Sequence, residues 1–355
     1  QTMFYSSGTT GRPKGIKRPV DGSPFGTAGL ADKLTGGVFG FSSNDVQLAL
    51  APLYHAAPLG WALGAQRMGS TVVVMDRFDP LEALKLIERY KVTHAQWVPT
   101  MFVRLLNLPE EERRKYDVSS LRCVVHAAAP CPVDIKRRMI EWFGPKILEY
   151  YAGSEGNGFC LVNSQQWLDH PGTVGKPIFG AVHILGDDQE ELPQGEIGMI
   201  YFGGGAPFQY HKDPEKSRSA VSKQGYSTLG DYGYLDKEGF VYIADRRTDL
   251  IISGGVNIYP RETEEALLLH PAVLDVAVIG APSKDFGQDV VAVVELKQGF
   301  EASPALAAEL AEFCRSKIAH LKCPKRIDFG ALPRTETGKL LRRKLKDKYA
   351  AEAAG

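Results

Sequence analysis

The segment from Tyr5 to Gly15, which reads YSSGTTGRPKG, has the residue types of a loop that binds a phosphate group. Its glycines let main-chain N–H groups approach an anion closely, because no side chain stands in the way. Its hydroxyl groups are additional donors, and the ammonium group of Lys14 is a mobile charge suited to a polyphosphate. The candidate phosphate-binding residues are Ser6, Ser7, Gly8, Thr9, Thr10, Gly11 and Lys14.

The order of residues in this segment differs from that of a Walker A loop. A Walker A loop reads G-x-x-x-x-G-K-[ST], whereas Lys14 is followed here by Gly15 and the glycines are spaced differently. A flexible connection rich in Gly, Ser and Thr would have a similar composition. Composition alone therefore leaves open both an anion site and a simple connection.

Strands and helices alternate along the first part of the chain. Asp79 followed by Pro80 predicts the start of a helix, and a second helix is predicted from Pro132 to Phe143, with Gly144 as its end. Such alternation with continuous apolar strands predicts an α/β fold with parallel or mixed sheets covered on both faces. The predicted strands are 46–55, 71–75, 92–98, 123–129 and 147–152.

Candidate ligand-binding residues lie where these strands end. Ligands of open α/β sheets bind beyond the carboxyl ends of the strands. His55 follows the first predicted strand, and Ala128, Ala129 and Pro130 follow a later one. Residues 152–155 follow the strand 147–152. These segments therefore lie where a ligand of such a sheet is expected.

The pattern changes after about residue 172. Short strands separated by Gly, Pro and Asp turns predict a small antiparallel or barrel-like unit over about 172–246. A small α+β unit follows, with one helix expected at 260–269 and another after Ser303 and Pro304. We expect a large domain over 1–246, which includes the barrel-like unit, and a small domain over 247–355.

Composition excludes several classes of partner. The 42 basic and 42 acidic side chains cancel, so no net charge steers the protein to nucleic acid or to an anionic membrane. No run of about 18 apolar residues predicts a transmembrane helix. The eight histidines lack the spacing of a zinc site. The five cysteines form no C-x-x-C pair, which favours reduced, buried thiols in a cytosolic protein: Cys123, Cys131, Cys160, Cys314 and Cys323.

Six segments, in the correct order, resemble the signatures of one superfamily. It is the adenylate-forming superfamily, which includes acyl-CoA and aryl-CoA ligases, luciferase and the adenylation domains of peptide synthetases. The chain resembles its acyl-CoA synthetases, and the resemblance implies that an N-terminal part of the large domain is missing ahead of residue 1. The segments are YSSGTTGRPKG, PLYH, YAGSEG, YSTLGDYGYLD, DRRTDLIISGGVNIYPRETE and PRTETGKLLRRKL.

The resemblance implies a role for each residue of an ATP site. Tyr151 would stack on adenine and Ser154 would touch the α-phosphate. Asp231 would accept hydrogen bonds from the ribose hydroxyls, and Arg246 would reach the ribose and the phosphates. Glu155 would bind Mg²⁺, which usually takes only one or two protein carboxylates. Their ordinary structural roles would be a core aromatic, a turn residue or a solvated ion pair.

The resemblance also implies moving parts. Lys339 would bind between the substrate carboxylate and the α-phosphate, although a lysine in a basic tail is otherwise solvated. His55 would gate the carboxylate site rather than transfer a proton. The small domain would rotate about a hinge at 246–249, near Thr248, where relatives commonly have Asp or Lys. Ala152, which replaces a usual glycine, would line the acyl and CoA passage together with Gly153, Gly254 and Gly255.

These features predict an ATP-dependent acid–CoA ligase that uses ATP, Mg²⁺ and coenzyme A. A fatty acid is the expected substrate, because the residues near the acyl site are small or apolar and none is acidic: Ala56, Ala57, Leu59, Trp61, Ala152 and Gly153. An adenylation domain that loads a carrier protein is one alternative. A nucleotide-binding fragment without turnover is another. The sequence leaves open whether the protein forms a homo-oligomer.

Overall fold

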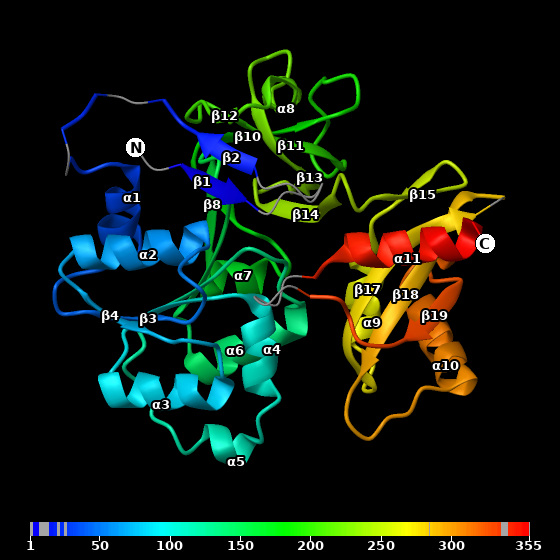
Figure 1. Cartoon of the computed structure of the whole chain (residues 1–355), viewed down its shortest axis with the longest axis horizontal. Helices are drawn as coiled ribbons and strands as arrows, with labels where there is room; N and C mark the ends of the chain where they lie inside the picture. The colour runs from blue at the N-terminus through cyan, green and yellow to red at the C-terminus, as the bar shows by residue number, and fades with distance from the viewer. Residues whose placement is uncertain are drawn as a thin grey trace. The chain divides into compact units, whose positions relative to one another are not determined.

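The chain separates into two compact units, each with its own core (Figure 1). The first unit comprises Gln1–Leu229 and Tyr234–Tyr242, and the second comprises Gly230–Gly233 and Ile243–Gly355. The structure is a computed structural model, and the residues that it describes are 3–6, 14–19, 22–24, 27–283, 285–334 and 340–354.

A seven-stranded sheet forms the centre of the first unit. Its strand order is β4-β3-β5-β6-β7-β8-β9, and the pairs from β4 to β7 are parallel whereas β8 and β9 are antiparallel to their neighbours. The prediction of a parallel or mixed sheet is confirmed. The strands are β3 (Val46–Ala49), β4 (Thr71–Val74), β5 (His94–Trp97), β6 (Cys123–His126), β7 (Ile147–Ala152), β8 (Phe159–Asn163) and β9 (Lys176–Phe179).

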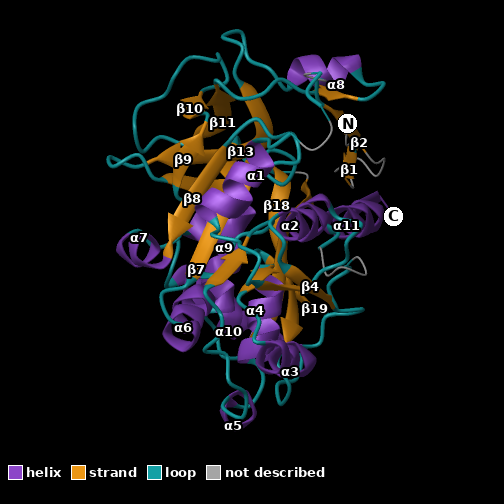
Figure 2. Ribbon diagram, turned by 90° about the vertical axis from the view of Figure 1, so that its left-hand side faces the viewer, coloured by secondary structure: helices purple, strands orange, loops and turns teal. Residues whose placement is uncertain are grey.

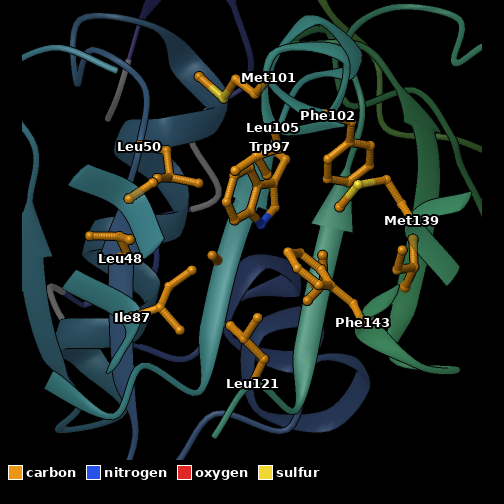
Figure 3. Packing of buried hydrophobic residues seen from close by; sticks show 14 of the residues in the cluster. Leu48, Leu50, Ile87, Trp97, Met101, Phe102, Leu105, Leu121, Met139 and Phe143 are labelled. Carbon is orange, nitrogen blue, oxygen red and sulfur yellow. The ribbon is translucent and has the colours of Figure 1, made fainter. Parts of the chain in front are cut away.

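Helices cover this sheet on both faces. Trp97 and Phe102 lie in the larger cluster, which joins α3, α4 and α6 to one face (Figure 3). On the other face, Trp61 of α2 packs against Phe39, with ring centroids 4.5 Å apart. The helices of this unit are α1 (Leu30–Asp32), a π-helix (Lys33–Val38), α2 (Ala56–Arg67), α3 (Pro80–Tyr90), α4 (Pro99–Leu106), α5 (Glu110–Arg113), α6 (Val133–Phe143), α7 (Ser164–Asp169) and α8 (Pro214–Ser219).

Local signals place α3 and α6 where they were predicted. The Asp79 carboxylate accepts hydrogen bonds from the amides of Leu81 and Glu82 at 3.0 and 2.9 Å, and Pro80 is the first helical residue. Gly144 caps α6 with a positive φ of 81°. Both helix ends are therefore set by residues next to them in the sequence.

Two predicted strands are longer than the observed ones. The strand predicted over 46–55 ends at Ala49, because the chain turns and α2 begins at Ala56. The strand predicted over 123–129 ends at His126. Ala128 has a φ of 73°, in the left-handed region, so an extended strand cannot continue through it.

Two smaller sheets complete the first part of the chain (Figure 2). One has the order β10-β11-β13-β14 and the other has the order β1-β2-β12. Strand β9 falls in the stretch expected for the barrel-like unit, yet it pairs with β8 of the large sheet. The strands are β1 (Phe4–Ser6), β2 (Lys14–Lys17), β10 (Ala181–Leu185), β11 (Gly198–Gly203), β12 (Gln209–Tyr210), β13 (Ser227–Leu235) and β14 (Val241–Arg246).

The second unit is a three-stranded sheet between helices, as predicted for a small α+β unit. Strands β17 and β18 are antiparallel, and β19 is parallel to β18. Helices α9 and α10 pack on one face and α11 on the other. The elements are β15 (Ile251–Ser253), β16 (Val256–Ile258), α9 (Pro260–Leu268), β17 (Val273–Ser283), β18 (Gly287–Leu296), α10 (Pro304–Arg315), a 3₁₀ turn (His320–Lys322), β19 (Arg326–Phe329) and α11 (Arg342–Ala354).

The five cysteines are buried and free, as the sequence predicts for reduced thiols. Burial raises the pKa of Cys160 and of Cys123 to about 12. Among the helices that the structure describes, none is long and apolar enough to cross a membrane.

Candidate active site

Glu155, the predicted Mg²⁺ ligand, lies in the loop that follows β7. The hydroxyl of Tyr210 donates a hydrogen bond to Glu155 Oε1 at 2.8 Å. The carbonyl of the preceding residue, Ser154, accepts a hydrogen bond from Arg18 Nη2 at 2.8 Å. Hydrogen bonds therefore connect the loop to β12 and to the segment that directly follows β2.

Lys14 approaches the same tyrosine from the glycine-rich segment. Its Nζ lies 5.3 Å from the centroid of the Tyr210 ring, within the range of a cation–π interaction. Strand β2, which carries Lys14, pairs with β12 (Figure 1). Tyr210 stands opposite Ile16 in that pair. Lys14 and Glu155 lie far apart in the sequence, and both contact the side chain of Tyr210. The sequence motifs did not indicate a role for Tyr210.

The rest of the glycine-rich loop lies outside the described residues. The candidates from Ser7 to Gly11 belong to it, so the structure places none of them. The strands on either side of the loop are described, and Ser6 of β1 pairs with Lys14 of β2 in an antiparallel register. The two ends of the loop are therefore held side by side.

Tyr151 and Ala152 are the last two residues of β7, and Gly153 follows them directly. All three are half-buried, and the Tyr151 ring lies 5.9 Å from the ring of Phe202. A Cβ atom at Gly153 would lie 2.3 Å from Leu229 Cδ2 and 2.6 Å from Glu155 Oε2. The absence of a side chain at Gly153 therefore leaves the space in which the Glu155 carboxylate sits.

The other strand-end candidates lie along the same edge of the sheet. Ala128, Ala129 and Pro130 are exposed just beyond β6, which runs parallel to β7 with His126 opposite Glu149. His55 precedes α2 in the segment that follows β3, and its exposed ring lies 4.6 Å from that of Tyr54. Because β3, β6 and β7 are parallel, their carboxyl ends share one edge of the sheet, and these candidates follow those ends.

The residues predicted to bind the ribose form an ion pair in the second unit. Arg246 Nε lies 3.4 Å from Asp231 Oδ1. The side chain of Asp231 is buried, whereas that of Arg246 is 49% exposed. This geometry matches the ordinary alternative for Arg246, an ion pair whose guanidinium group is partly exposed to solvent.

The predicted hinge residue is held by the C-terminal helix. Thr248 is exposed, and its carbonyl accepts a hydrogen bond from Lys346 Nζ of α11 at 2.7 Å. Gly254 and Gly255 form the two-residue turn between β15 and β16, with φ angles of 57° and 80°. Positive φ at both positions is typical of a type I′ hairpin turn, which explains the two consecutive glycines.

Lys339 lies outside the described residues, so its position stays a prediction. The chain on either side of it is anchored in the second unit. Arg334 forms an ion pair with Asp275 and an isolated β-bridge with Leu340. Arg342 Nη2 contacts both oxygens of Glu264 at 2.6 Å.

A buried charged cluster under the strand-end loops was not predicted from the sequence. Lys136 of α6 is fully buried, and its Nζ lies 2.5 Å from Glu149 Oε2 of β7. His126 Nε2 lies 3.5 Å from the same oxygen. Burial lowers the pKa of Lys136, although Glu149 opposes this shift. Burial, helped by the charge of Lys136, holds the pKa of His126 well below its usual range, so that imidazole is neutral.

The carboxylate of Glu155 fits the chemistry of the implied metal ion, Mg²⁺. A single carboxylate fits Mg²⁺, which prefers oxygen ligands and completes its shell with phosphate oxygens and water. Glu155 offers such a carboxylate in a fixed orientation, because Tyr210 holds its Oε1. Within the described part of the chain, no group of three or more His, Cys, Asp or Glu residues could hold a metal ion.

Two family models match this chain. The model described as AMP-binding enzyme matches residues 1–209, and the model of the C-terminal domain of the AMP-binding enzymes matches residues 262–339. The first match lies within the first unit of the structure, and the second match lies within the second unit. The chain belongs to the AMP-binding enzyme family, which confirms the resemblance to the adenylate-forming enzymes.

Curated relatives include CoA ligases for different acids. A long-chain-fatty-acid–CoA ligase of Bacillus subtilis is 35% identical over 97% of this chain and 60% of its own length. A 2-succinylbenzoate–CoA ligase of the same organism is 34% identical over 99% of this chain and 69% of its own length. The chain thus spans about two thirds or less of these relatives.

Solved structures of similar proteins hold adenine nucleotides. ATP-bound MatB from Rhodopseudomonas palustris is 30% identical, with a TM-score of 0.83 over 98% of this chain and 68% of that one. O-succinylbenzoate CoA synthetase from Bacillus subtilis, in complex with an acyl-adenylate intermediate, is 32% identical, with a TM-score of 0.80 over 97% of this chain and 68% of that one.

Proposed function

We propose that this protein is an ATP-dependent acid–CoA ligase that works through an acyl-adenylate. The observation that carries the proposal is the convergence of Lys14 and Glu155 on Tyr210, at the sheet edge where ligands of α/β folds bind. A cationic and an anionic group so placed suit the polyphosphate of ATP and its metal ion, respectively. The named activities of the relatives support the same reaction.

The proposed reaction has two steps. In the first, a carboxylate oxygen attacks the α-phosphorus of ATP, the bond to the bridging oxygen of pyrophosphate breaks, and pyrophosphate leaves. In the second, the CoA thiol loses its proton, its sulfur attacks the acyl carbon, and the bond to AMP breaks. Both reactants of the first step are anions, so charge neutralisation and in-line positioning are what the protein must supply.

We assign the residues of this chain to these tasks. Lys14 and the glycine-rich loop bind the β- and γ-phosphates, and Ser154 touches the α-phosphate. Tyr151 stacks on the adenine, beside the segment 128–130. Magnesium, when bound through Glu155, neutralises phosphate charge. The ribose and phosphate contacts proposed in the second unit are Asp231 and Arg246.

The second unit carries the proposed moving parts. Lys339 binds between the substrate carboxylate and the α-phosphate, and the hinge lies at 246–249 with Thr248 as its pivot. Gly254, Gly255, Ala152 and Gly153 line the acyl and CoA passage, and His55 gates it. The division into a large domain over 1–246 and a small domain over 247–355 is part of the same proposal. A cytosolic location and the oligomeric state stay predictions.

We propose a fatty acid as the substrate. The support is the apolar surroundings of α2, where Trp61 is buried beside Phe39 and Phe41 and where the predicted acyl residues are small or apolar. No acidic residue in the predicted acyl stretches stands ready to pair with an amino group. An aryl acid is the competing substrate, since the relatives include ligases of both kinds.

The test is carboxylate-dependent exchange of labelled pyrophosphate into ATP. The full-length protein is assayed with saturated fatty acids of increasing length, benzoate, 2-succinylbenzoate and an amino acid. Exchange with fatty acids at the highest kcat/KM is the expected result. Exchange only with aryl acids would show that the substrate is an aryl acid rather than a fatty acid. No exchange with any acid would overturn the ligase proposal.

Lys339→Ala separates the two half-reactions. The variant should lose adenylation, because the ammonium group that offsets charge between carboxylate and α-phosphate is gone. It should keep most of its thioester formation from supplied acyl-adenylate and CoA, which needs no such group. An equal loss of both half-reactions would contradict the role assigned to Lys339.

A further inference from the structure

Tyr210 contacts three charged side chains at once, although only 7% of its surface is exposed. Its hydroxyl donates to Glu155 Oε1 at 2.8 Å. The Nζ atoms of Lys14 and Lys216 lie 5.3 and 5.8 Å from the centroid of its ring. One aromatic side chain therefore carries an anion at its polar end and cations over its ring.

The backbone around Tyr210 is fixed from two sides. Strand β12 pairs with β2, which places Tyr210 opposite Ile16. The Tyr210 amide donates to Ser217 Oγ of α8 at 2.9 Å. The ring belongs to a small buried cluster with Ile16, Phe208 and Ala220. Its hydroxyl is therefore presented to Glu155 from a rigid position.

The direction of the hydrogen bond follows from the chemistry of the two groups. A tyrosine hydroxyl carries its proton at neutral pH, because the ordinary pKa of the phenol is about 10. An ionised carboxylate only accepts hydrogen bonds, so Tyr210 is the donor. The bond engages Oε1 and leaves Oε2 over Gly153, where a Cβ atom would lie only 2.6 Å away. The carboxylate is thus restricted in both position and rotation.

We propose that Tyr210 is a positioning residue that orients Glu155 for a divalent cation and Lys14 for the polyphosphate bound to that cation. The inference rests on the proposed function, because it takes Glu155 as the metal ligand and Lys14 as a phosphate ligand. The hydroxyl of Tyr210 acts on the carboxylate, and its ring acts on the ammonium group. Orienting both in advance removes the entropy that each would otherwise lose on binding.

The competing explanation is that Tyr210 only fills the small core of Ile16, Phe208 and Ala220. A packing role needs the ring but not the hydroxyl, so Tyr210→Phe separates the two. The variant keeps the ring and both cation contacts and removes one donor. Tyr226→Phe is the matched control, because Tyr226 lies in the same unit, where its ring stacks on His183 at 3.9 Å.

The primary measurement is binding of Mn²⁺, a paramagnetic substitute for Mg²⁺. The full-length protein is titrated with Mn²⁺ in the presence of α,β-methylene-ATP, and free Mn²⁺ is followed by electron paramagnetic resonance. A hydrogen bond to a charged group corresponds to a change of about tenfold or more in an equilibrium constant. We expect Tyr210→Phe to weaken Mn²⁺ binding by about tenfold and Tyr226→Phe to leave it unchanged.

Pyrophosphate exchange supplies the second measurement. Tyr210→Phe should shift the Mg²⁺ concentration for half-maximal exchange upward by a similar factor, whereas kcat at saturating Mg²⁺ should stay close to that of wild type. Tyr210→Leu also removes the ring over which Lys14 sits, so it should raise the KM for MgATP as well. If the leucine variant fails to fold, the phenylalanine variant still decides the role of the hydroxyl.

A double-mutant cycle with Glu155→Gln tests whether Tyr210 acts through Glu155. In that background Tyr210→Phe should have little further effect on Mn²⁺ binding, because the oriented carboxylate is already gone. Additive losses, or wild-type Mn²⁺ binding by Tyr210→Phe, would overturn the inference. A wild-type protein that exchanges no pyrophosphate with any acid would instead refute the proposed function, so the two failures are distinct.

Discussion

Replacing Lys136 with methionine should destabilise the first unit strongly, because it would leave the Glu149 carboxylate buried without its cation. The Lys136 ammonium is fully buried, 2.5 Å from Glu149 Oε2, and 4.7 Å from the centroid of the Trp167 ring. Burial, the larger cause of the lowered pKa of His126, remains in this variant and disfavours a charge on the imidazole that could replace the lost one. Removing one partner of a buried ion pair costs about 3–5 kcal/mol of unfolding free energy.

The double variant, Lys136→Met with Glu149→Leu, should be close to wild type in stability. Buried ion pairs recover little more than the cost of removing both charges from water, so apolar residues of similar volume often replace them without loss. The sum of the losses in the two single variants should therefore exceed the loss in the double variant by at least about 3 kcal/mol. Arg138→Met on the same helix is a control, since its ion pair with Asp134 is largely exposed and should contribute little.

Tryptophan fluorescence during urea unfolding is a suitable assay. All four tryptophans, Trp61, Trp97, Trp142 and Trp167, belong to the first unit, so the transition reports that unit alone. The free energy in water follows from linear extrapolation of the transition. A single variant as stable as wild type, or a double variant as unstable as the single ones, would refute the account of this cluster.

Three further predictions concern pH and close packing. His126 is held neutral in the folded state and protonates near its usual pKa in the unfolded state. The unfolding free energy should therefore decrease as the pH is lowered below about 6.5, by up to about 1.4 kcal/mol per pH unit. Urea titrations at several pH values should show a smaller decrease for His126→Phe. Gly153→Ala should abolish most pyrophosphate exchange, since its Cβ would lie 2.6 Å from the Glu155 carboxylate, whereas Gly37→Ala, which enters open space, should not; equal activity of the two would contradict the close approach. Gly255→Val should cost about 1–2 kcal/mol, because its φ is 80°, and faster amide exchange in β15 and β16 would report it; unchanged exchange rates would argue against the strained turn.

Features with a local structural cause could be predicted from the sequence. The start of α3 depends on Asp79 and Pro80 alone, and both the cap and the helix are confirmed. The parallel strands were predictable as well, because alternating strands and helices leave few other topologies. By contrast, no sequence feature predicted that β8 runs antiparallel to β7. The short connection between these two strands includes Ser154 and Glu155, which were interpreted as site residues rather than as part of a turn.

The unpredicted residues depend on pairing between distant segments. Lys136 and Glu149 lie on different elements, and each alone reads as a surface charge on a helix or a strand. Tyr210 lies in a two-residue strand whose partner, β2, is near the other end of the unit. The only available signal was its position in an aromatic pair, with Phe208, ahead of a charged turn. Lys14 and Glu155 were found because each belongs to a recognisable motif.

The pairing of β2 with β12 also sets an order of events during protein synthesis. Lys17 of β2 pairs with Gln209 of β12, so nearly the whole first unit must leave the ribosome before β2 finds its partner. At the usual speed of translation that delay is roughly 10 s or longer. The parallel sheet between them can assemble in the meantime, which makes docking of the β1-β2 hairpin a late step. The nascent chain would therefore gain its candidate nucleotide site only after most of its core has formed.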